Sequence, residues 1–281
     1  MITSNKRLDS ILIEEYKNIE NYLKEININK KARLKIIEGI KLPEDLILSL
    51  SMGIPIILGV IYNYTTYTLI ASAIYTIEVS FKIWEIKIAN GYYSPLTRSI
   101  YLNKKYLEEI INKSSNAFYS NNIEIKEGTV AAITLLGYSI VDYPIYIDKN
   151  MKNIKEIISK VVADTALAHE KAHLFIGISD IKASDLEYLI YLDMNDLLDA
   201  NDLYKYEKTK EVIRKNVKIC VEYVKNKKRY NPYNIGLCYA NITLYENNFS
   251  IDIKNEIEKL RHMKDKDIIN EIKNYALNYS N

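Results

Sequence analysis

Cysteine is nearly absent from the chain, which contains only Cys220 and Cys238. Two cysteines are too few for a disulfide framework, and neither belongs to a Cys-x-x-Cys pair or stands beside a histidine at ligand spacing. The sequence therefore excludes a secreted fold that depends on many disulfides.

An excess of charge of either sign is also lacking. The chain has 38 Lys and Arg residues against 36 Asp and Glu residues, which gives a formal net charge of +2. So small a net charge produces no large field to hold a phosphate backbone, so nucleic acid is excluded as the main partner. With 281 residues and 48% hydrophobic content, the chain can bury a substantial core.

The N-terminal residues 1–10 have no apolar stretch followed by small residues, so we expect no cleavable signal peptide and a cytoplasmic protein. Charged residues are absent from residues 46–77, a run longer than the roughly 20 residues that a membrane helix needs. However, Gly53, Pro55, Gly59 and a polar run at 63–68 divide it. We favour buried core helices, with membrane association through 46–77 as the alternative.

Helical periodicity dominates the rest of the sequence. Apolar residues three and four apart predict a helix over 8–26, a short helix follows at 30–40, and 69–88 fits a helix better than a strand. After Asp148 the pattern predicts helices over 151–176, 184–204, 206–227, 233–245, 251–263 and 265–278.

Strand patterns are few and short. Residues 97–103 read as an edge strand behind Pro95, and 122–125 and 144–147 are further candidates. The expected fold is therefore α+β and mainly helical. We expect a helical N-terminal region at 1–90 with partly buried apolar helices, and a second region at 91–281 that combines a small sheet with a helical C-terminal part.

Two of the three histidines, His169 and His173, stand in the motif H-E-x-x-H. On a helix, positions four apart face the same way, so both imidazoles can bind one Zn²⁺ while Glu170 lies beside the reacting water. Apolar residues form one stripe of this helix, and polar residues including Asp164 and Lys171 form an expected solvent face. A buried, purely structural histidine pair is the plainer alternative.

At this motif the chain resembles the zincin metallopeptidases, in which a sheet precedes the H-E-x-x-H helix and substrate binds along the outer strand. The resemblance covers roughly residues 91–200, rests mainly on His169, Glu170 and His173, and departs from the family at Lys171. It implies a zinc-dependent hydrolase that acts on a peptide or protein substrate.

A catalytic zinc keeps three protein ligands and one open position, so a third ligand is needed. The astacin-like and matrix-protease pattern is disfavoured, because Ile176 and Ser179 replace its glycine and histidine and Asp180 is one residue out of register. The pattern resembles the gluzincins, whose acidic ligand comes from the next helix.

Two acids on the helix predicted from Ser184 compete for this role. Glu187 would return close to His173 in the first helical turn, although Ser184 and Glu187 also form a capping-box pattern. Asp193 has the gluzincin spacing but a shorter side chain, and it lies about 14 Å along the helix axis from the predicted start at Ser184. We favour Glu187 over Asp193, with Asp180 third.

The sequence thus predicts a zinc metallopeptidase with Zn²⁺ bound by His169, His173 and Glu187, and with Glu170 as the general base. A tyrosine from 233–239 is a candidate neighbour of the site, whereas His262 is expected on the surface. The competing hypotheses are a helical binding module with a non-catalytic metal site, and a membrane-anchored metalloprotease.

Overall fold

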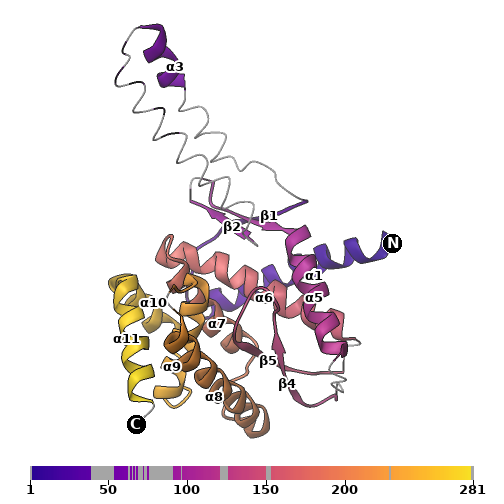
Figure 1. The fold of residues 1–281 in the computed structure, drawn as a ribbon. Helices are drawn as coiled ribbons and strands as arrows, with labels where there is room; N and C mark the ends of the chain where they lie inside the picture. The colour runs from indigo at the N-terminus through magenta and orange to yellow at the C-terminus, as the bar shows by residue number, and fades with distance from the viewer. Residues whose placement is uncertain are drawn as a thin grey trace. The chain divides into compact units, whose positions relative to one another are not determined.

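The structure is a computed structural model of the chain. It describes residues 2–38, 54–62, 64, 66, 68, 72, 75, 91–95, 97–120, 126–149, 153–227 and 229–279. The described part is mainly helical with two small sheets, which confirms the mainly helical α+β class (Figure 1). The predictions for 122–125, nearly all of 69–88 and much of 46–77 fall outside the described residues.

The chain forms two compact units, which we describe separately. Unit 1 comprises Met1–Lys31 and Leu107–Asn281, and unit 2 comprises Ala32–Tyr106. The expected division after residue 90 coincides with neither boundary. Within the described part of the chain, no helix is both long and apolar enough to cross a membrane.

Unit 1 contains nearly all of the helices predicted from periodicity. Its elements are α1 (Ile2–Glu25), most of α5 (Lys104–Ser120), β4 (Val130–Thr134), β5 (Asp142–Tyr146), α6 (Ile154–Ile176), α7 (Asp180–Met194), α8 (Leu203–Asn226), α9 (Pro232–Glu246), α10 (Ile253–His262) and α11 (Asp265–Asn278). The helix predicted from Ser184 begins four residues earlier, because Ser179 and not a later residue caps it. β4 and β5 pair antiparallel, which confirms the strand predicted at 144–147.

Unit 2 corrects two predictions. Its elements are β1 (Arg33–Ile37), α3 (Ile54–Ile61), β2 (Gly91–Ser94) and β3 (Ser99–Asn103). The helix predicted at 30–40 is wrong, since 33–37 pair in parallel with β3. The edge-strand assignment of 97–103 is also wrong, because β3 lies between β1 and β2. Both errors have one cause: the partner strand lies more than sixty residues away in sequence.

Helix α6 is buried on nearly all sides, so the solvent face expected for it is wrong. Lys171 is fully buried, and its Nζ donates to Glu20 Oε1 at 2.6 Å on α1. Asp164 is likewise buried and interacts with the carboxyl group of Glu15, also on α1. Helix α1 therefore covers the polar side of α6 and supplies partners for its charges.

Helix α7 packs against both α6 and α9. The crossing with α9 is close at Gly236, where an added Cβ would overlap the carbonyl oxygen of Ile181 and lie 2.7 Å from Ser184 Cβ. Only a residue without a side chain fits this contact. Gly236 thus sets the distance between the helix that carries Glu187 and the helix that carries Tyr233.

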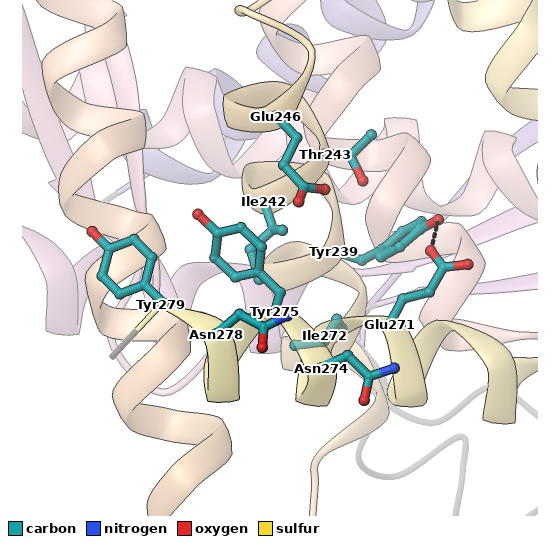
Figure 2. A pocket seen from close by; sticks show the side chains of 10 residues that line it. All are labelled: Tyr239, Ile242, Thr243, Glu246, Glu271, Ile272, Asn274, Tyr275, Asn278 and Tyr279. Atoms are coloured by element: carbon teal, nitrogen blue, oxygen red, sulfur yellow. Dashed lines mark hydrogen bonds between the residues drawn. The ribbon is translucent and has the colours of Figure 1, made fainter. Parts of the chain in front are cut away.

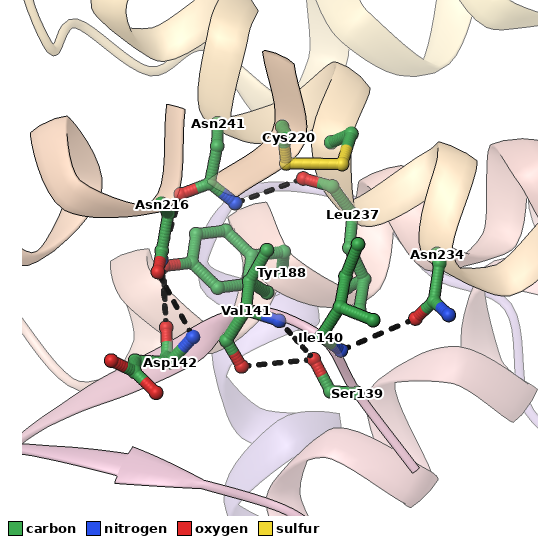
Figure 3. The surroundings of a disulfide bond; sticks show 11 residues. Ser139, Ile140, Val141, Asp142, Tyr188, Asn216, Cys220, Asn234, Leu237 and Asn241 are labelled. Atoms are coloured by element: carbon green, nitrogen blue, oxygen red, sulfur yellow. Dashed lines mark hydrogen bonds between the residues drawn. A yellow bond between two sulfur atoms is a disulfide. The ribbon is translucent and has the colours of Figure 1, made fainter. Parts of the chain in front are cut away.

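A disulfide and a buried amide network hold α8 and α9 together (Figure 3). Cys220 and Cys238 are bonded, with their Cα atoms 5.3 Å apart. One bridge is not a disulfide framework, so it is compatible with the expectation from the cysteine count. Next to the bridge, Asn216 Nδ2 donates to Asp142 O at 2.8 Å and to Asn241 Oδ1 at 3.0 Å, so β5 is tied to both helices.

Candidate metal centre

The two histidines of the motif lie one turn apart on α6. Asn153 caps the start of this helix through a hydrogen bond to Glu156 N. The imidazole rings of His169 and His173 are edge to face, with their centroids 4.9 Å apart. The helix ends at Gly177, whose φ of +81° lies in the region that favours glycine. This turn reverses the chain and starts α7 only a few residues beyond His173.

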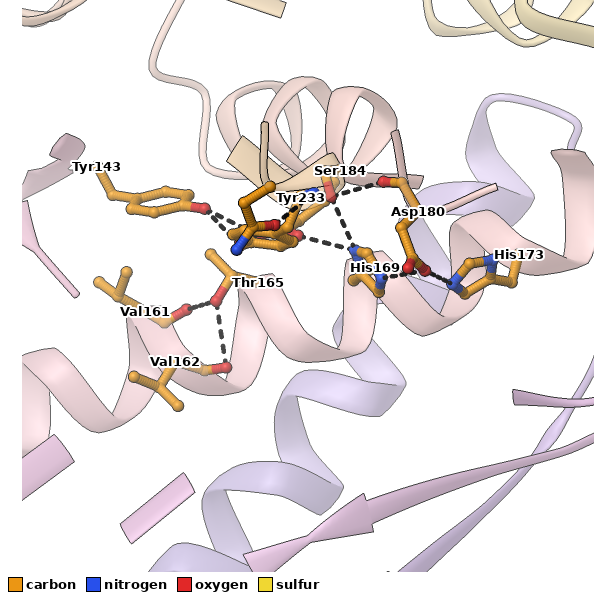
Figure 4. A network of polar contacts seen from close by, with 11 residues as sticks. Tyr143, Val161, Val162, Thr165, His169, His173, Asp180, Ser184 and Tyr233 are labelled. Atoms are coloured by element: carbon orange, nitrogen blue, oxygen red, sulfur yellow. Dashed lines mark hydrogen bonds and ion pairs between the residues drawn. The ribbon is translucent and has the colours of Figure 1, made fainter. Parts of the chain in front are cut away.

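Asp180 stands in the first turn of α7, and its carboxylate lies between the two imidazoles (Figure 4). Its Oδ1 atom is 3.7 Å from His173 Nε2 and 4.0 Å from His169 Nε2. About 60% of the Asp180 side chain is exposed, whereas the two histidines are mostly covered. The three groups therefore converge on a point that faces solvent on the Asp180 side.

The opposite nitrogen of each imidazole is occupied by a hydrogen bond within the protein. His169 Nδ1 lies 3.1 Å from Glu187 Oε2, and His173 Nδ1 lies 2.7 Å from the carbonyl oxygen of Gly177. Because these oxygens only accept hydrogen bonds, each Nδ1 carries the proton. In the neutral form of each ring the Nε2 lone pair is then directed toward Asp180, which is the arrangement that metal-binding histidines require.

Glu187 is fully buried and has several partners. Its Oε1 accepts hydrogen bonds from Tyr143 Oη at 2.8 Å and from Tyr233 Oη at 2.6 Å. Burial and the Glu187 charge raise the pKa of both tyrosines well above the usual range, so both remain protonated donors. The ring of Tyr233 also lies 5.6 Å from that of His169. These contacts fix the carboxylate against His169.

The two histidines differ in their proton affinity. Burial lowers the pKa of His173 to about 3, with a further contribution from the nearby His169, so His173 is neutral near pH 7. Burial also lowers the pKa of His169, but the hydrogen bond and charge of Glu187, aided by Glu170 and Asp180, outweigh it and raise this pKa overall. A neutral His173 is ready to act as a ligand.

The donor set fits zinc. Two imidazole nitrogens and a carboxylate oxygen are the ligands of many catalytic zinc sites, and all three donor atoms lie within 4.8 Å of one another. Bonds of about 2.0–2.1 Å around a tetrahedral zinc separate ligand atoms by roughly 3.4 Å. The distances of 3.7 and 4.0 Å from Asp180 Oδ1 to the two Nε2 atoms are longer than this value, so the three groups would move slightly closer together around a bound metal.

The structure thus places the three acids considered as third ligands in different surroundings. Asp180 faces the Nε2 atoms, Glu187 faces the Nδ1 atom of His169, and Asp193 accepts a hydrogen bond from Tyr22 Oη at 2.5 Å on α1. The capping-box interpretation of Ser184 and Glu187 is wrong, since α7 begins at Asp180 and both residues lie in its interior.

The remaining candidates are placed as follows. Glu170 is buried, with 5% of its surface exposed, and its charge raises the pKa of its neighbour His169. His262 is exposed on α10, as expected. Tyr233 lies at the site, which agrees with the tyrosine expected from 233–239. Tyr143 was not foreseen, because one tyrosine among 25 carries no signal in the sequence.

A separate cavity of about 530 Å³ lies between α9 and α11 (Figure 2). Its lining includes Tyr239, Tyr275, Glu246 and Glu271, and Tyr239 donates to Glu271 at 2.8 Å. None of the candidate metal-binding residues lines this cavity. The histidine cluster and the cavity are therefore different features of unit 1.

No family of known proteins matches this chain, and neither a curated protein nor a solved structure is significantly similar to it.

Proposed function

We propose that the protein is a zinc-dependent metallopeptidase of zincin type, with Zn²⁺ held by His169, His173 and an acid from α7. The observation that carries the proposal is the position of Asp180, whose carboxylate oxygen lies in front of both Nε2 atoms while both Nδ1 atoms are hydrogen-bonded elsewhere. For the third ligand we now favour Asp180 over Glu187. The substrate class is a peptide or protein.

Each group has a defined task in this mechanism. Zinc, when bound, lowers the pKa of a water molecule and polarises the carbonyl oxygen of the scissile peptide. The Glu170 carboxylate accepts a proton from the attacking water and passes it to the leaving amine nitrogen as the C–N bond breaks. Glu187 holds the His169 ring in place through Nδ1, supported by Tyr143 and Tyr233.

The exposure of Asp180 supports a role in catalysis over a purely structural metal site. Structural zinc sites are closed by four protein ligands, whereas catalytic sites keep an open position. Within the described residues, three candidate ligands meet here, two imidazoles and one carboxylate, and Asp180 is mostly exposed. Water and substrate therefore have a side from which to approach.

The test compares wild type with Glu170→Gln on a diverse pool of peptides, with mass spectrometry of the new termini. We expect zinc-dependent cleavage by wild type that a chelator abolishes. Glu170→Gln should keep its zinc and its fold but cleave about 10²–10⁴-fold more slowly, because proton transfer is lost.

Two outcomes would contradict the proposal. Equal cleavage by wild type and Glu170→Gln would remove Glu170 from the mechanism. Zinc binding without any zinc-dependent cleavage across the pool would favour a helical binding module with a non-catalytic metal site.

A further inference from the structure

Helix α3 has no polar side. The side chains of its sequence, Ile-Pro-Ile-Ile-Leu-Gly-Val-Ile, carry no charge, amide or hydroxyl group. The helix lies within the charge-free run of residues 46–77. A helix that is apolar around its whole circumference is stable only when apolar material surrounds it.

Three of the four described side chains of α3 are largely exposed, and only Ile56 is partly covered. Ile57, Val60 and Ile61, which share one face at helical spacing, are 61%, 62% and 67% exposed, and Tyr62 and Tyr64 just beyond them are equally open. Single exposed apolar residues are normal, but a contiguous apolar patch marks a site of interaction.

The shape of this apolar surface indicates what covers it. A protein groove or a second copy of the chain covers one side of a helix and normally adds hydrogen bonds at the rim of the contact. α3 offers no side-chain group for such bonds and has no polar side to leave in water. Lipid surrounds a helix on all sides and needs no polar partner, so a bilayer fits this element best.

The residues that follow α3 support the same conclusion. The described residues 66, 68, 72 and 75 have helical backbone, and the hydroxyls of Thr68 and Ser72 donate to the carbonyl oxygens of Tyr64 and Thr68, four residues back, at 2.5 and 2.6 Å. Thr68 is only 7% exposed, so among the described residues here the uncovered apolar surface is limited to α3 and the tyrosines directly after it. The tyrosines after α3 are suited to the boundary between hydrocarbon and headgroups.

We propose that α3 docks the protein on a lipid bilayer, with Ile57, Val60 and Ile61 entering the hydrocarbon of one leaflet. Eight residues at 1.5 Å each make a helix of about 12 Å, well short of the roughly 30 Å hydrocarbon core, so α3 enters the bilayer without crossing it. Because α3 carries no charge, binding depends on apolar contact and is insensitive to salt.

Flotation with phosphatidylcholine vesicles tests this proposal on the full chain. Wild type should float with the vesicles at both low and high salt. The double variant Ile57→Asp/Val60→Asp should bind about a hundredfold more weakly, because charge is excluded from hydrocarbon. Leu203→Asp is the matched control, since Leu203 is equally exposed on α8, and it should float like wild type.

Circular dichroism and zinc content verify that the double variant is folded. Wild type that stays in the soluble fraction, or a double variant that floats as well as wild type, would overturn the proposal. A discrete oligomer in lipid-free buffer that the double variant dissociates, without flotation of wild type, would show that α3 binds a second copy instead. None of these readouts depends on peptide cleavage, so the result is independent of the proposed enzymatic function.

Discussion

Asp180 and Glu187 approach the histidines from opposite sides of the imidazole rings, and on this difference we propose Asp180 as a metal ligand and Glu187 as a positioning group. Asp180 faces both Nε2 atoms, whereas Glu187 contacts Nδ1 of His169. A carboxylate on Nδ1 fixes the orientation and basicity of the ring without binding the metal itself.

We therefore predict that Asp180→Asn weakens zinc binding more than Glu187→Gln does. Loss of a group that orients a ligand typically lowers metal affinity about 10–100-fold, so Glu187→Gln should fall in this range and Asp180→Asn beyond it. Asp193→Asn is the matched control and should bind zinc like wild type, because Asp193 contacts Tyr22 and not the histidines. Titration against a competing chelator measures all three. A larger loss in Glu187→Gln than in Asp180→Asn would return the ligand role to Glu187.

The sequence located His169, Glu170 and His173 because their relation is local, one turn of a single helix. Among the three candidate third ligands, the sequence pattern places Asp180 last, and this has a physical reason. An acid in the first turn of α7 does return to His173, but the sequence pattern predicts the helix start at Ser184, because Ser184 and Glu187 have the spacing of a capping box. The actual cap is Ser179, which makes Asp180 the first-turn acid. Which of two similar serines caps a helix depends on tertiary packing, and the sequence does not encode it locally.

At the scale of elements, the contact between α1 and α6 contains a buried pair of acids. Burial raises the pKa of Asp164 well above its ordinary 3.8, and the charge of Glu15 raises it further. The folded chain therefore binds more protons than the unfolded chain once the pH exceeds about 3.8. As a result, the free energy of unfolding falls as pH rises from there through the raised pKa.

Asp164→Asn should abolish this fall in the free energy of unfolding with rising pH, because the amide is neutral at every pH and can donate a hydrogen bond to the Glu15 carboxylate. We expect the variant to match wild type near pH 4 and to melt several degrees higher at pH 8. Glu25→Gln, an exposed substitution on the same helix α1, should show no such pH-dependent gain. Thermal unfolding across this pH range measures both variants. A lower melting temperature of Asp164→Asn at pH 8 would show that the ionised carboxylate is stabilising.

The crossing of α7 and α9 gives a second prediction for elements. Gly236→Ala would press a methyl group against Ile181 O and Ser184, and backbone cannot move aside as a flexible side chain can. We expect a loss of about 1–3 kcal/mol or more in the free energy of unfolding by urea, with weaker zinc binding because α7 carries Asp180. Glu246→Ala, an exposed change on α9, is the control. Unchanged stability of Gly236→Ala would mean that the helices separate easily.

Helices were predicted far better than strands, because a helix shows its period within its own residues. The periodicity after Asp148 predicts the six helices that are present, but the helix predicted over 184–204 is α7 at Asp180–Met194, which ends ten residues earlier. The sequence predicts a helix at β1 and an edge position for β3. Both predictions are wrong because β1 and β3 pair with each other although they are distant in sequence. α5 was overlooked although Leu107, Ile110 and Ile111 have helical spacing and are buried.

At the scale of the whole molecule, the proposed zinc ligands come from two helices that follow each other in unit 1. His169 and His173 come from α6 and Asp180 from α7, so a metal bound by all three links these helices across the turn at Gly177. A ligand that binds only the folded chain stabilises it by an amount that grows with its concentration.

Zinc should accordingly raise the melting temperature of the protein. At a free concentration one hundred times the dissociation constant, the stabilisation is about 2.7 kcal/mol. For a unit of this size, each kcal/mol corresponds to about 2–4 °C, so we expect a shift of roughly 5–10 °C relative to chelated protein. His169→Ala and His173→Ala should abolish the shift. His262→Ala should retain it, because the third histidine is exposed on α10 and lies outside the cluster. Scanning calorimetry with zinc and with a chelator measures each variant, and an equal shift in wild type and His169→Ala would show that zinc binds elsewhere.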